Sequence, residues 1–556
     1  MFHQLLTPVD NSLALSFLVA ILPIATVLIL LGVCKRPAWQ AAFAGLIVGL
    51  GMAVGVWHMP LRLGLSSALN GAVFALWPVM WMVINALLLY NIAVASGRFD
   101  AFRSWVIAHL PHDRRVVLIV IGFCFGSLLE GIAGFGAPVA ITASLLIGVG
   151  FPALEALVFV LIFNTTPVAF GALGTPITVL AAVTGLPAQA LAAMIGRQLP
   201  LMAGFLPFYV IALYGGWRSV RSLWPVLLVA GASFGLAQFA ASNYLNYTLT
   251  DVFAALASLL LTGTFLQFWR PAADSQFTIS MDSEHAISTS PAATLRAVSP
   301  AGTTDGPSAV PPWQGWAPWL ILTAIVIPWT YLNVAALGQK AISWPGLDRT
   351  VLISLFHDKP YSAVWIFQPL GTGTAILLAA LVTALFVRLS PAELFRCVLR
   401  TLGQLWQAVA TVMLIVALAY VMNYSGLAYT LGLAVASTGR AFILFSPFLG
   451  WIAVFLSGSD TSGNALFGNL QVVAARQLQL NPLLFAAANS SGGVLGKMIS
   501  PQNIATGVSV TDLKGREGAV LARTFIHSVV LTLVLVIIVT AQQYLWPQVI
   551  PGYTIP

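Results

Sequence analysis

The chain contains, within an apolar region at 115–184, the sequence Glu130-Gly131-Ile132-Ala133-Gly134-Phe135-Gly136-Ala137-Pro138. Three glycines weaken any helix through this stretch, and Pro138 removes a backbone donor. Irregular backbone at membrane depth survives only where it is buried in protein or lines a wet cavity. The stretch therefore predicts a broken helix inside a bundle of membrane-spanning helices.

The composition requires lipid as the solvent for most of the chain. Of 556 residues, 59% are hydrophobic and 7% are charged, whereas soluble domains carry about 25% charged residues. The net charge of +8 comes from short basic loop clusters, which set membrane orientation and do not indicate nucleic-acid binding. Apolar segments of spanning length can be read at 13–34, 38–57, 74–95, 187–215, 222–241, 250–268, 316–337, 363–387, 404–424 and 519–546.

The basic loop residues predict how the chain is oriented. Lys35-Arg36 follow the first span and mark the cytoplasmic side, because cytoplasmic loops carry the excess of Lys and Arg. Counting spans from there places both termini outside. The loop 338–362 is also expected outside, although its three basic residues make it an exception to the rule.

Two parts of the chain resemble each other at a nearly constant spacing. Asn164-Thr165-Thr166 matches Asn489-Ser490-Ser491 at an offset of 325, and Gly131 and Gly136 match Gly458 and Gly463 at an offset of 327. The orientation places the two copies upside down relative to each other. Inverted repeats of this kind are the architecture of alternating-access transporters, with the site at the repeat interface.

The repeat divides the chain into four parts. They are an N-terminal repeat at 1–218 with broken motifs at 130–138 and 164–176, a two-span connector at 219–269, a flexible cytoplasmic linker at 270–312 and a C-terminal repeat at 313–556 with broken motifs at 457–464 and 489–501. The linker is rich in Ser, Thr, Pro and Ala, which is typical of mobile segments.

The tips of the predicted half-helices are candidate binding groups for a carboxylate. A half-helix N-terminus exposes N–H groups and about half a positive charge. Pro138 suits the first turn of one half-helix, and a Ser or Thr near 461–462 suits the N-cap of the other. The candidates are Gly134, Gly136, Thr461, Ser462 and Asn464 at the tips, with Asn164, Thr165, Asn489 and Ser490 lining the same cavity. The alternative is that these small residues only permit close helix packing.

A few charged residues lie inside the apolar regions. Glu130 and Asp460 lie in the two broken motifs, where desolvation favours a protonated carboxyl group, so both are candidates for carrying a proton. Lys497 could meet a bound carboxylate or pair with Asp460, and Arg197 could form a bidentate carboxylate contact. The alternatives are a structural ion pair or backbone-bonded acid for the carboxylates, an interfacial position for Lys497 and a structural pair for Arg197.

The sequence offers no chemistry for an enzyme or a metal site. Cys34, Cys124 and Cys397 show neither a disulfide framework nor a metal-binding spacing. Nucleotide-binding and nucleophile motifs are absent from the sequence as well. We therefore expect no metal and no cofactor, and a membrane-embedded enzyme or a proton-pumping subunit is only a remote alternative.

Several long motifs resemble the bacterial L-lactate permease family. They are Glu130-Gly-Ile-Ala-Gly-Phe-Gly-Ala-Pro-Val-Ala-Ile-Thr142, Asn164-Thr-Thr-Pro-Val-Ala-Phe-Gly171, Gly196-Arg-Gln-Leu-Pro200, Gly458-Ser-Asp-Thr-Ser-Gly-Asn-Ala-Leu-Phe467 and Gly496-Lys-Met-Ile-Ser-Pro-Gln502. The resemblance implies an all-α polytopic inner-membrane carrier of about 12–14 transmembrane segments with elevator-like motion. It also implies proton-coupled uptake of L-lactate, D-lactate and glycolate.

We therefore expect a symporter of small 2-hydroxy monocarboxylates. Its partners would be the carboxylate substrate, protons and membrane lipid, and a homodimer is left open. The nearest alternative is a sodium-coupled carboxylate carrier, since Asn, Ser and Thr groups with backbone carbonyls could also bind Na⁺. A passive channel is a further alternative.

Overall fold

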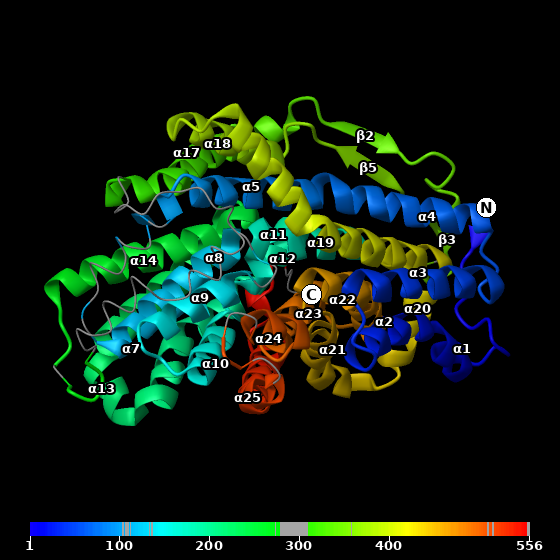
Figure 1. Ribbon diagram of the computed structural model, residues 1–556. Helices are drawn as coiled ribbons and strands as arrows, with labels where there is room; N and C mark the ends of the chain where they lie inside the picture. Colours follow the sequence, from blue (N-terminus) through cyan, green and yellow to red (C-terminus); the bar gives the residue numbers. More distant parts are fainter. Residues whose placement is uncertain are drawn as a thin grey trace.

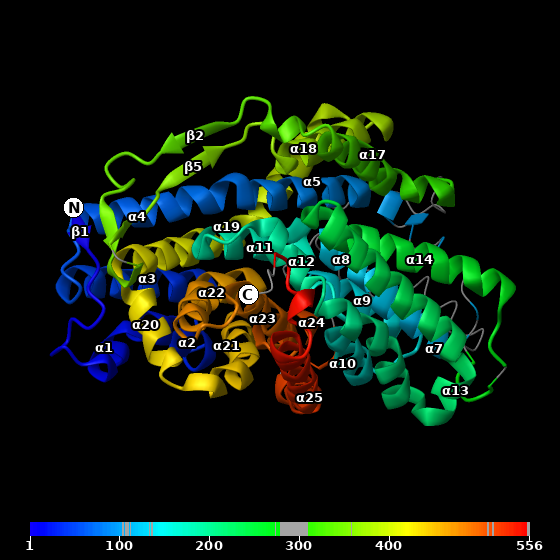
Figure 2. The ribbon, with the colours of Figure 1, turned by 180° about the vertical axis from the view of Figure 1, so that it is seen from behind.

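The computed structural model is a bundle of helices with a few short strands along one side (Figures 1 and 2). It describes residues 1–552 except 100, 103–104, 106–110, 112, 133, 135–136, 273, 279–309, 357, 509–510 and 514–515. Most of the expected linker at 270–312 and the candidate residue Gly136 therefore lie outside the described residues.

The first half of the chain forms long and short helices joined by short turns. Up to residue 184 these are α1 (Leu13–Ala20), α2 (Leu22–Gly32), α3 (Ala38–Gly55), α4 (Leu61–Phe74), η1 (Ala75–Met80), α5 (Trp81–Ala95), α7 (Arg114–Val117), η2 (Leu118–Phe125), α8 (Gly126–Ile132), α9 (Ala137–Gly148), α10 (Ala153–Phe163), η3 (Val168–Phe170) and α11 (Gly171–Thr184). The chain continues with α12 (Ala188–Ile195), α13 (Leu199–Tyr244), η4 (Tyr247–Leu249) and α14 (Thr250–Phe268). The connector predicted at 219–269 comprises the second part of α13, η4 and α14.

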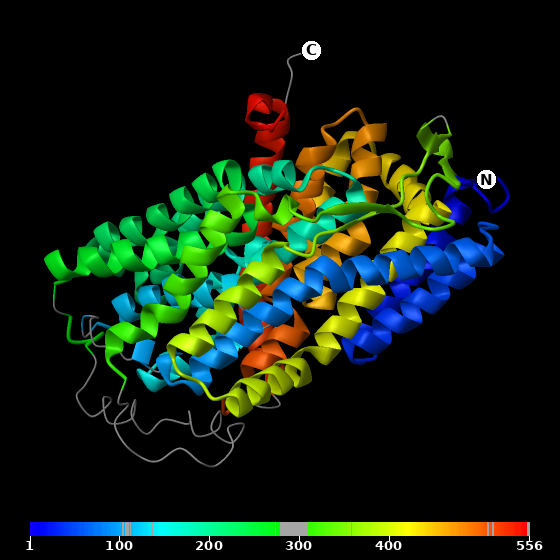
Figure 3. The same ribbon diagram turned by 90° about the horizontal axis from the view of Figure 1, so that it is seen from above.

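The second half repeats this pattern of long and short helices. Its helices are α17 (Ala317–Tyr331), α18 (Thr372–Phe386), α19 (Pro391–Ser425), α20 (Leu427–Ala436), α21 (Phe442–Ser457), α22 (Asp460–Gln477), α23 (Pro482–Lys497), α24 (Pro501–Val508) and α25 (Glu517–Tyr544). The run from α4 to α5 packs along α19, although the two lie far apart in sequence (Figures 1 and 3).

The helices confirm a polytopic membrane protein. Within the described residues, nine helical stretches are long and apolar enough to cross a membrane, or up to ten when α10 and the bent segment after it count as one span. The stretch 188–244 has 57 residues, a length of about 85 Å against a hydrocarbon core of about 30 Å. The backbone reverses at Gly216, and an added Cβ on Gly231 would lie 2.6 Å from the carbonyl oxygen of Gly204. This stretch is therefore an antiparallel hairpin that crosses twice, as the separate apolar segments at 187–215 and 222–241 predict.

The strands lie at the N-terminus and in or directly after the loop 338–362, which the sequence predicts on the outer side. β1 (Phe2–His3) pairs in parallel with β3 (Val351–Ile353), and β3 pairs with β4 (Lys359–Pro360). β2 (Lys340–Ser343) pairs antiparallel with β5 (Val364–Phe367). The N-terminus thus lies on the same face of the bundle as the loop 338–362 (Figure 2). The apolar segment predicted at 363–387 is helical only from Thr372, because its aromatic and β-branched start forms β5.

Two helix breaks occur where the sequence predicts them. The first separates α8 from α9, where Gly134 has φ +55° and Pro138 lies in the first turn of α9. The second separates α21 from α22, where Gly458 has φ +72°. The N-cap of α22 is Ser459, whose side chain accepts a hydrogen bond from the Ser462 backbone. The predicted N-cap at 461–462 is therefore wrong, since these two residues lie in the first turn of α22.

The other two breaks differ from each other. Between α10 and α11 the chain bends by 64°, and residues 172–174 have positive φ. In the matching segment, α23 runs unbroken through Asn489 to Lys497, and the chain breaks only at 498–500 before α24. The predicted break at 489–501 is therefore confined to its C-terminal end.

A seam of glycines joins α21 to α23. An added Cβ on Gly450, Gly492 or Gly496 would lie 1.9, 2.0 or 2.2 Å from a carbonyl oxygen of the opposite helix. No side chain fits at such distances, so the two backbones touch directly. This close approach positions the polar face of α23 against α22.

Candidate functional site

A buried ion pair joins the two halves of the chain. The Nζ atom of Lys497, at the end of α23, lies 2.6 Å from Oε1 of Glu130 on α8, and the two side chains are 7% and 3% exposed. The Nδ2 group of Asn164, at the end of α10, donates to Oε2 of the same carboxylate at 2.9 Å. Lys497 thus pairs with Glu130, and not with Asp460 as the sequence suggested.

The space beside the carboxylate depends on glycine. An added Cβ on Gly171 would lie 3.2 Å from Oε1 of Glu130. A side chain there would crowd the carboxylate that Lys497 binds. The segment from Asn164 to Gly171 therefore supplies one hydrogen-bond donor to Glu130 and, at Gly171, a position without a side chain beside the carboxylate.

A second polar cluster surrounds Asp460 in the first turn of α22. The Ser490 hydroxyl donates to Oδ2 of Asp460 at 2.6 Å, and Asn464 Nδ2 donates to the same oxygen at 3.2 Å. Asn489 Nδ2 donates to Asn464 Oδ1 at 2.9 Å, and Gln471 Nε2 donates to Asn489 Oδ1 at 2.8 Å. Among the described residues Oδ1 of Asp460 has no hydrogen-bond partner. The structure therefore brings four of the sequence-predicted residues into one network.

The remaining tip residues are buried near these clusters. Thr461 and Ser462 lie in the first turn of α22, beside Asp460. Thr165 is buried in the bend after α10, and its hydroxyl donates to the Ile162 carbonyl. Gly134 faces Ala172, at 3.0 Å from an added Cβ.

Arg197 has a different environment from the other candidates. It lies in the turn between α12 and α13, where its Nε donates to Asn243 at 2.8 Å and its Nη1 to the Val549 carbonyl. These hydrogen bonds tie the connector region to the segment after α25. The contact of Arg197 with a carboxylate ligand stays a prediction.

Sequence reasoning missed one buried acid, Asp251. It lies in the first turn of α14, is 1% exposed, and accepts a hydrogen bond from Gln238 at 3.3 Å. An added Cβ on Gly131 would lie 2.9 Å from the Cβ of Asp251, so the backbone beside Glu130 packs directly on this residue. The signal in the sequence is a single acid near the start of an apolar span, within the predicted connector at 219–269.

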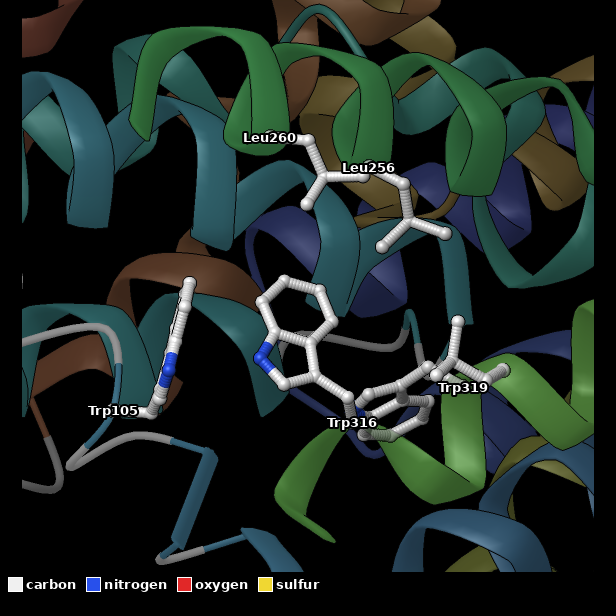
Figure 4. A pocket seen from close by; sticks show the side chains of 6 residues that line it. Trp105, Leu256, Leu260, Trp316 and Trp319 are labelled. Atoms are coloured by element: carbon white, nitrogen blue, oxygen red, sulfur yellow. The ribbon is translucent and has the colours of Figure 1, made fainter. Parts of the chain in front are cut away.

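The cavity in Figure 4 lies elsewhere. It has a volume of about 300 Å³ and is lined by Trp105, Leu256, Leu260, Trp316, Trp319 and Leu320. No carboxylate, amide or hydroxyl side chain lines it among the described residues. It therefore offers nothing that would hold a carboxylate, and it is not a candidate substrate site.

A family model described as L-lactate permease matches residues 16–546. The chain belongs to the L-lactate permease family. The L-lactate permease of Escherichia coli strain K12 is 40% identical over 99% of this chain and 100% of that protein. Glycolate permease GlcA of the same organism is 40% identical over 96% of this chain and 97% of that protein. The apolar helices and the membership in the L-lactate permease family both identify a multi-pass protein of the cell membrane.

The solved structures that are similar to this chain are distant ones. The YdaH transporter of Alcanivorax borkumensis aligns with 94% of this chain and 98% of that one, with a TM-score of 0.44 and 16% identity.

Proposed function

We propose that the protein takes up L-lactate and related small 2-hydroxy monocarboxylates, D-lactate and glycolate among them, together with protons. Support comes from relatives named for L-lactate and glycolate. The observation that carries the proposal is the buried Lys497–Glu130 pair, because it places a cation and a protonatable acid in direct contact. The protein lies in the cytoplasmic membrane, with both termini outside.

The pair couples a proton to the substrate by competition for one cation. In a buried site Lys497 can balance the charge of a single carboxylate, and in this conformation that carboxylate is Glu130. A substrate carboxylate can replace Glu130 only if Glu130 loses its charge, since an unpaired buried carboxylate is strongly unfavourable. Proton binding to Glu130 therefore frees Lys497 for the substrate, and one proton enters with each monoanion.

The second cluster is placed to hold the rest of a small hydroxy acid. Asn464, Ser490 and Thr461 offer amide and hydroxyl groups close to the N-terminus of α22. Asp460 carries an unpartnered oxygen within the described residues and is the second candidate for proton coupling. We assign the substrate to the space between this cluster, the α9 tip and Lys497.

Reciprocal packing supports the inverted repeats. Two copies related by a two-fold axis should make each contact between repeats twice, with the roles exchanged. α3 packs against α19 while α18 packs against α5, α11 packs against α22 while α24 packs against α9, and α12 packs against α23 while α25 packs against α10. Each contact thus has a counterpart in the order of the repeat. We infer an alternating-access cycle of the elevator type about this axis.

The first experiment measures radiolabelled L-lactate uptake by purified protein in liposomes, with an inward proton gradient and no sodium. We expect accumulation above the outside concentration, abolished by a protonophore. No accumulation would refute proton symport, and accumulation under a sodium gradient at fixed pH would instead establish the sodium-coupled alternative.

The Glu130→Gln variant tests the coupling step. A neutral side chain leaves Lys497 permanently available, so we expect L-lactate exchange to continue while proton-driven accumulation is lost. The exposed Glu393→Gln serves as the matched control and should accumulate L-lactate like the unaltered protein. Unchanged pH-driven accumulation in Glu130→Gln would remove Glu130 from the proton role.

A further inference from the structure

The buried centre holds more acids than bases. Glu130, Asp251 and Asp460 are each 3% exposed or less, and Lys497 is their only buried cationic neighbour within the described residues. Lys497 is bonded to Glu130, which leaves the other two carboxyl groups without a direct cation. Isolated ionised carboxylates are strongly disfavoured in a dry interior, where protonation is the usual resolution. The imbalance therefore requires further protons in this conformation.

The donors around each acid decide where a further proton binds. Asp460 accepts hydrogen bonds from Ser490 at 2.6 Å and from Asn464 at 3.2 Å, which stabilise an ionised group. Asp251 accepts only the 3.3 Å hydrogen bond from Gln238, and its Oδ2 has no partner in the described part of the chain. Asp251 is thus the least stabilised carboxylate of the three.

The surroundings of Asp251 connect it to the ion pair. α8 brings Gly131, next to Glu130, into contact with its Cβ, and Glu130 and Lys497 are the charged groups that act on it. Of the other titratable groups on elements packed against α14, Tyr247 on η4 hydrogen-bonds to Thr178, and Cys124 on η2 hydrogen-bonds to Ser258. α13 contributes Gln238, which also donates to the Thr166 carbonyl in the bend after α10. Asp251 therefore packs against α8, which carries Glu130, and is linked through Gln238 to the bend after α10, the helix that ends at Asn164.

We propose that Asp251 carries a second proton of the transport cycle, in addition to the one on Glu130. This rests on the proposed proton-coupled uptake and adds to it a stoichiometry. One proton binds the Glu130 carboxylate as the substrate anion takes its place, and a second binds Asp251 on the outer side. Both leave on the inner side with the substrate. Two protons and one monoanion move one net positive charge inward.

The test uses a membrane potential without a pH gradient. Liposomes containing the purified protein hold potassium inside, an impermeant cation replaces it outside, and valinomycin makes the interior negative, with no sodium present. We expect the unaltered protein to accumulate L-lactate under this potential alone. Asp251→Asn, which mimics the protonated group, should lose this response while it still exchanges L-lactate. The exposed Asp10→Asn should respond like the unaltered protein.

The outcomes separate this inference from the proposed function. Accumulation by the unaltered protein under a pH gradient but not under a potential would keep proton symport and overturn the second proton. An unchanged potential response in Asp251→Asn would overturn the assignment to Asp251. If Asp251→Asn does not fold, Asp251→Glu decides, since it keeps a titratable acid and must respond to the potential. A variant Asp251→Glu that exchanges L-lactate without that response would also overturn the inference.

Discussion

Replacing Lys497 by Met tests whether the buried ion pair behaves as an isolated unit. Methionine keeps most of the length of the lysine stem but removes its charge. Glu130, 3% exposed, would then face an apolar neighbour where Nζ lay 2.6 Å away. The carboxyl group must either stay charged without a cation or bind a proton. The second course avoids an unpaired charge in the interior, and breaking a buried pair by removing one partner costs about 3–5 kcal/mol.

The magnitude follows from the cost of holding that proton. A glutamic acid has an ordinary pKa of about 4.3. A folded state that must keep it protonated loses about 1.36 kcal/mol of stability for each pH unit above that pKa. The expected loss of stability is therefore about 4 kcal/mol at pH 7.5 and about 1.6 kcal/mol at pH 5.5. The sign is fixed: the deficit is small near pH 4.3 and grows as the pH rises.

Thermal unfolding of detergent-purified protein at the two pH values measures this effect. We expect Lys497→Met to lower the Tm relative to the unaltered protein much more at pH 7.5 than at pH 5.5. The double variant with Glu130→Gln and Lys497→Met contains neither charge and should recover most of the lost stability at pH 7.5. The single Glu130→Gln variant leaves an unpaired lysine and should show the opposite dependence on pH.

A Tm for Lys497→Met that falls equally at both pH values would refute this reasoning, because the loss would then come from packing and not from an unpaired carboxylate. Losses that simply add in the double variant would lead to the same conclusion, since residues in direct contact should couple.

Two other substitutions test the site and its surroundings. Gly493→Ala would place a Cβ 2.3 Å from Oδ1 of Asp460, so we expect the free energy of unfolding to fall by about 1–3 kcal/mol and L-lactate transport to be lost. Gly263→Ala on α14, which has open space around its Cβ, is the control. Equal activity of the two variants would show that the surroundings of Asp460 are not tightly packed. Arg197→Ala should lower the Tm and leave the KM for L-lactate unchanged, because the Arg197 side chain donates to Asn243 and to the Val549 carbonyl. A large rise in KM would place Arg197 in the substrate site.

The helix breaks that the sequence predicts correctly are those that depend on the backbone conformations of glycine and proline. Gly134 and Gly458 adopt positive φ, and Pro138 lies in the first turn of α9, as glycine and proline patterns indicate. Asn489-Ser490-Ser491 look equally disruptive in sequence, yet they lie in the unbroken helix α23. Their side chains bond to neighbouring helices, and sequence cannot show whether a polar residue satisfies a broken backbone or another side chain.

Pairing across the bundle could not be predicted either. Lys497 could have met Asp460 or a ligand as well as Glu130, since all three options satisfy one buried cation. The choice depends on α8 and α23 ending side by side, which is a tertiary property. Asp251 was missed for the same reason: an acid near the start of a span usually lies at an interface, and only the packing of Gly131 against it reveals its burial.

The glycine seam between α21 and α23 has a consequence for how the protein tolerates mutation. At Gly450, Gly492 and Gly496 even a methyl group meets a carbonyl oxygen, so every substitution must separate α21 from α23, the helix that carries Asn489 and Ser490. A saturation library selected for growth on L-lactate should therefore be depleted of all nineteen replacements at these positions. Leu444 and Phe445, exposed on α21, should accept most apolar residues. The positions that tolerate no substitution would thus follow the line of backbone contact between α21 and α23, although none of them carries a functional side chain.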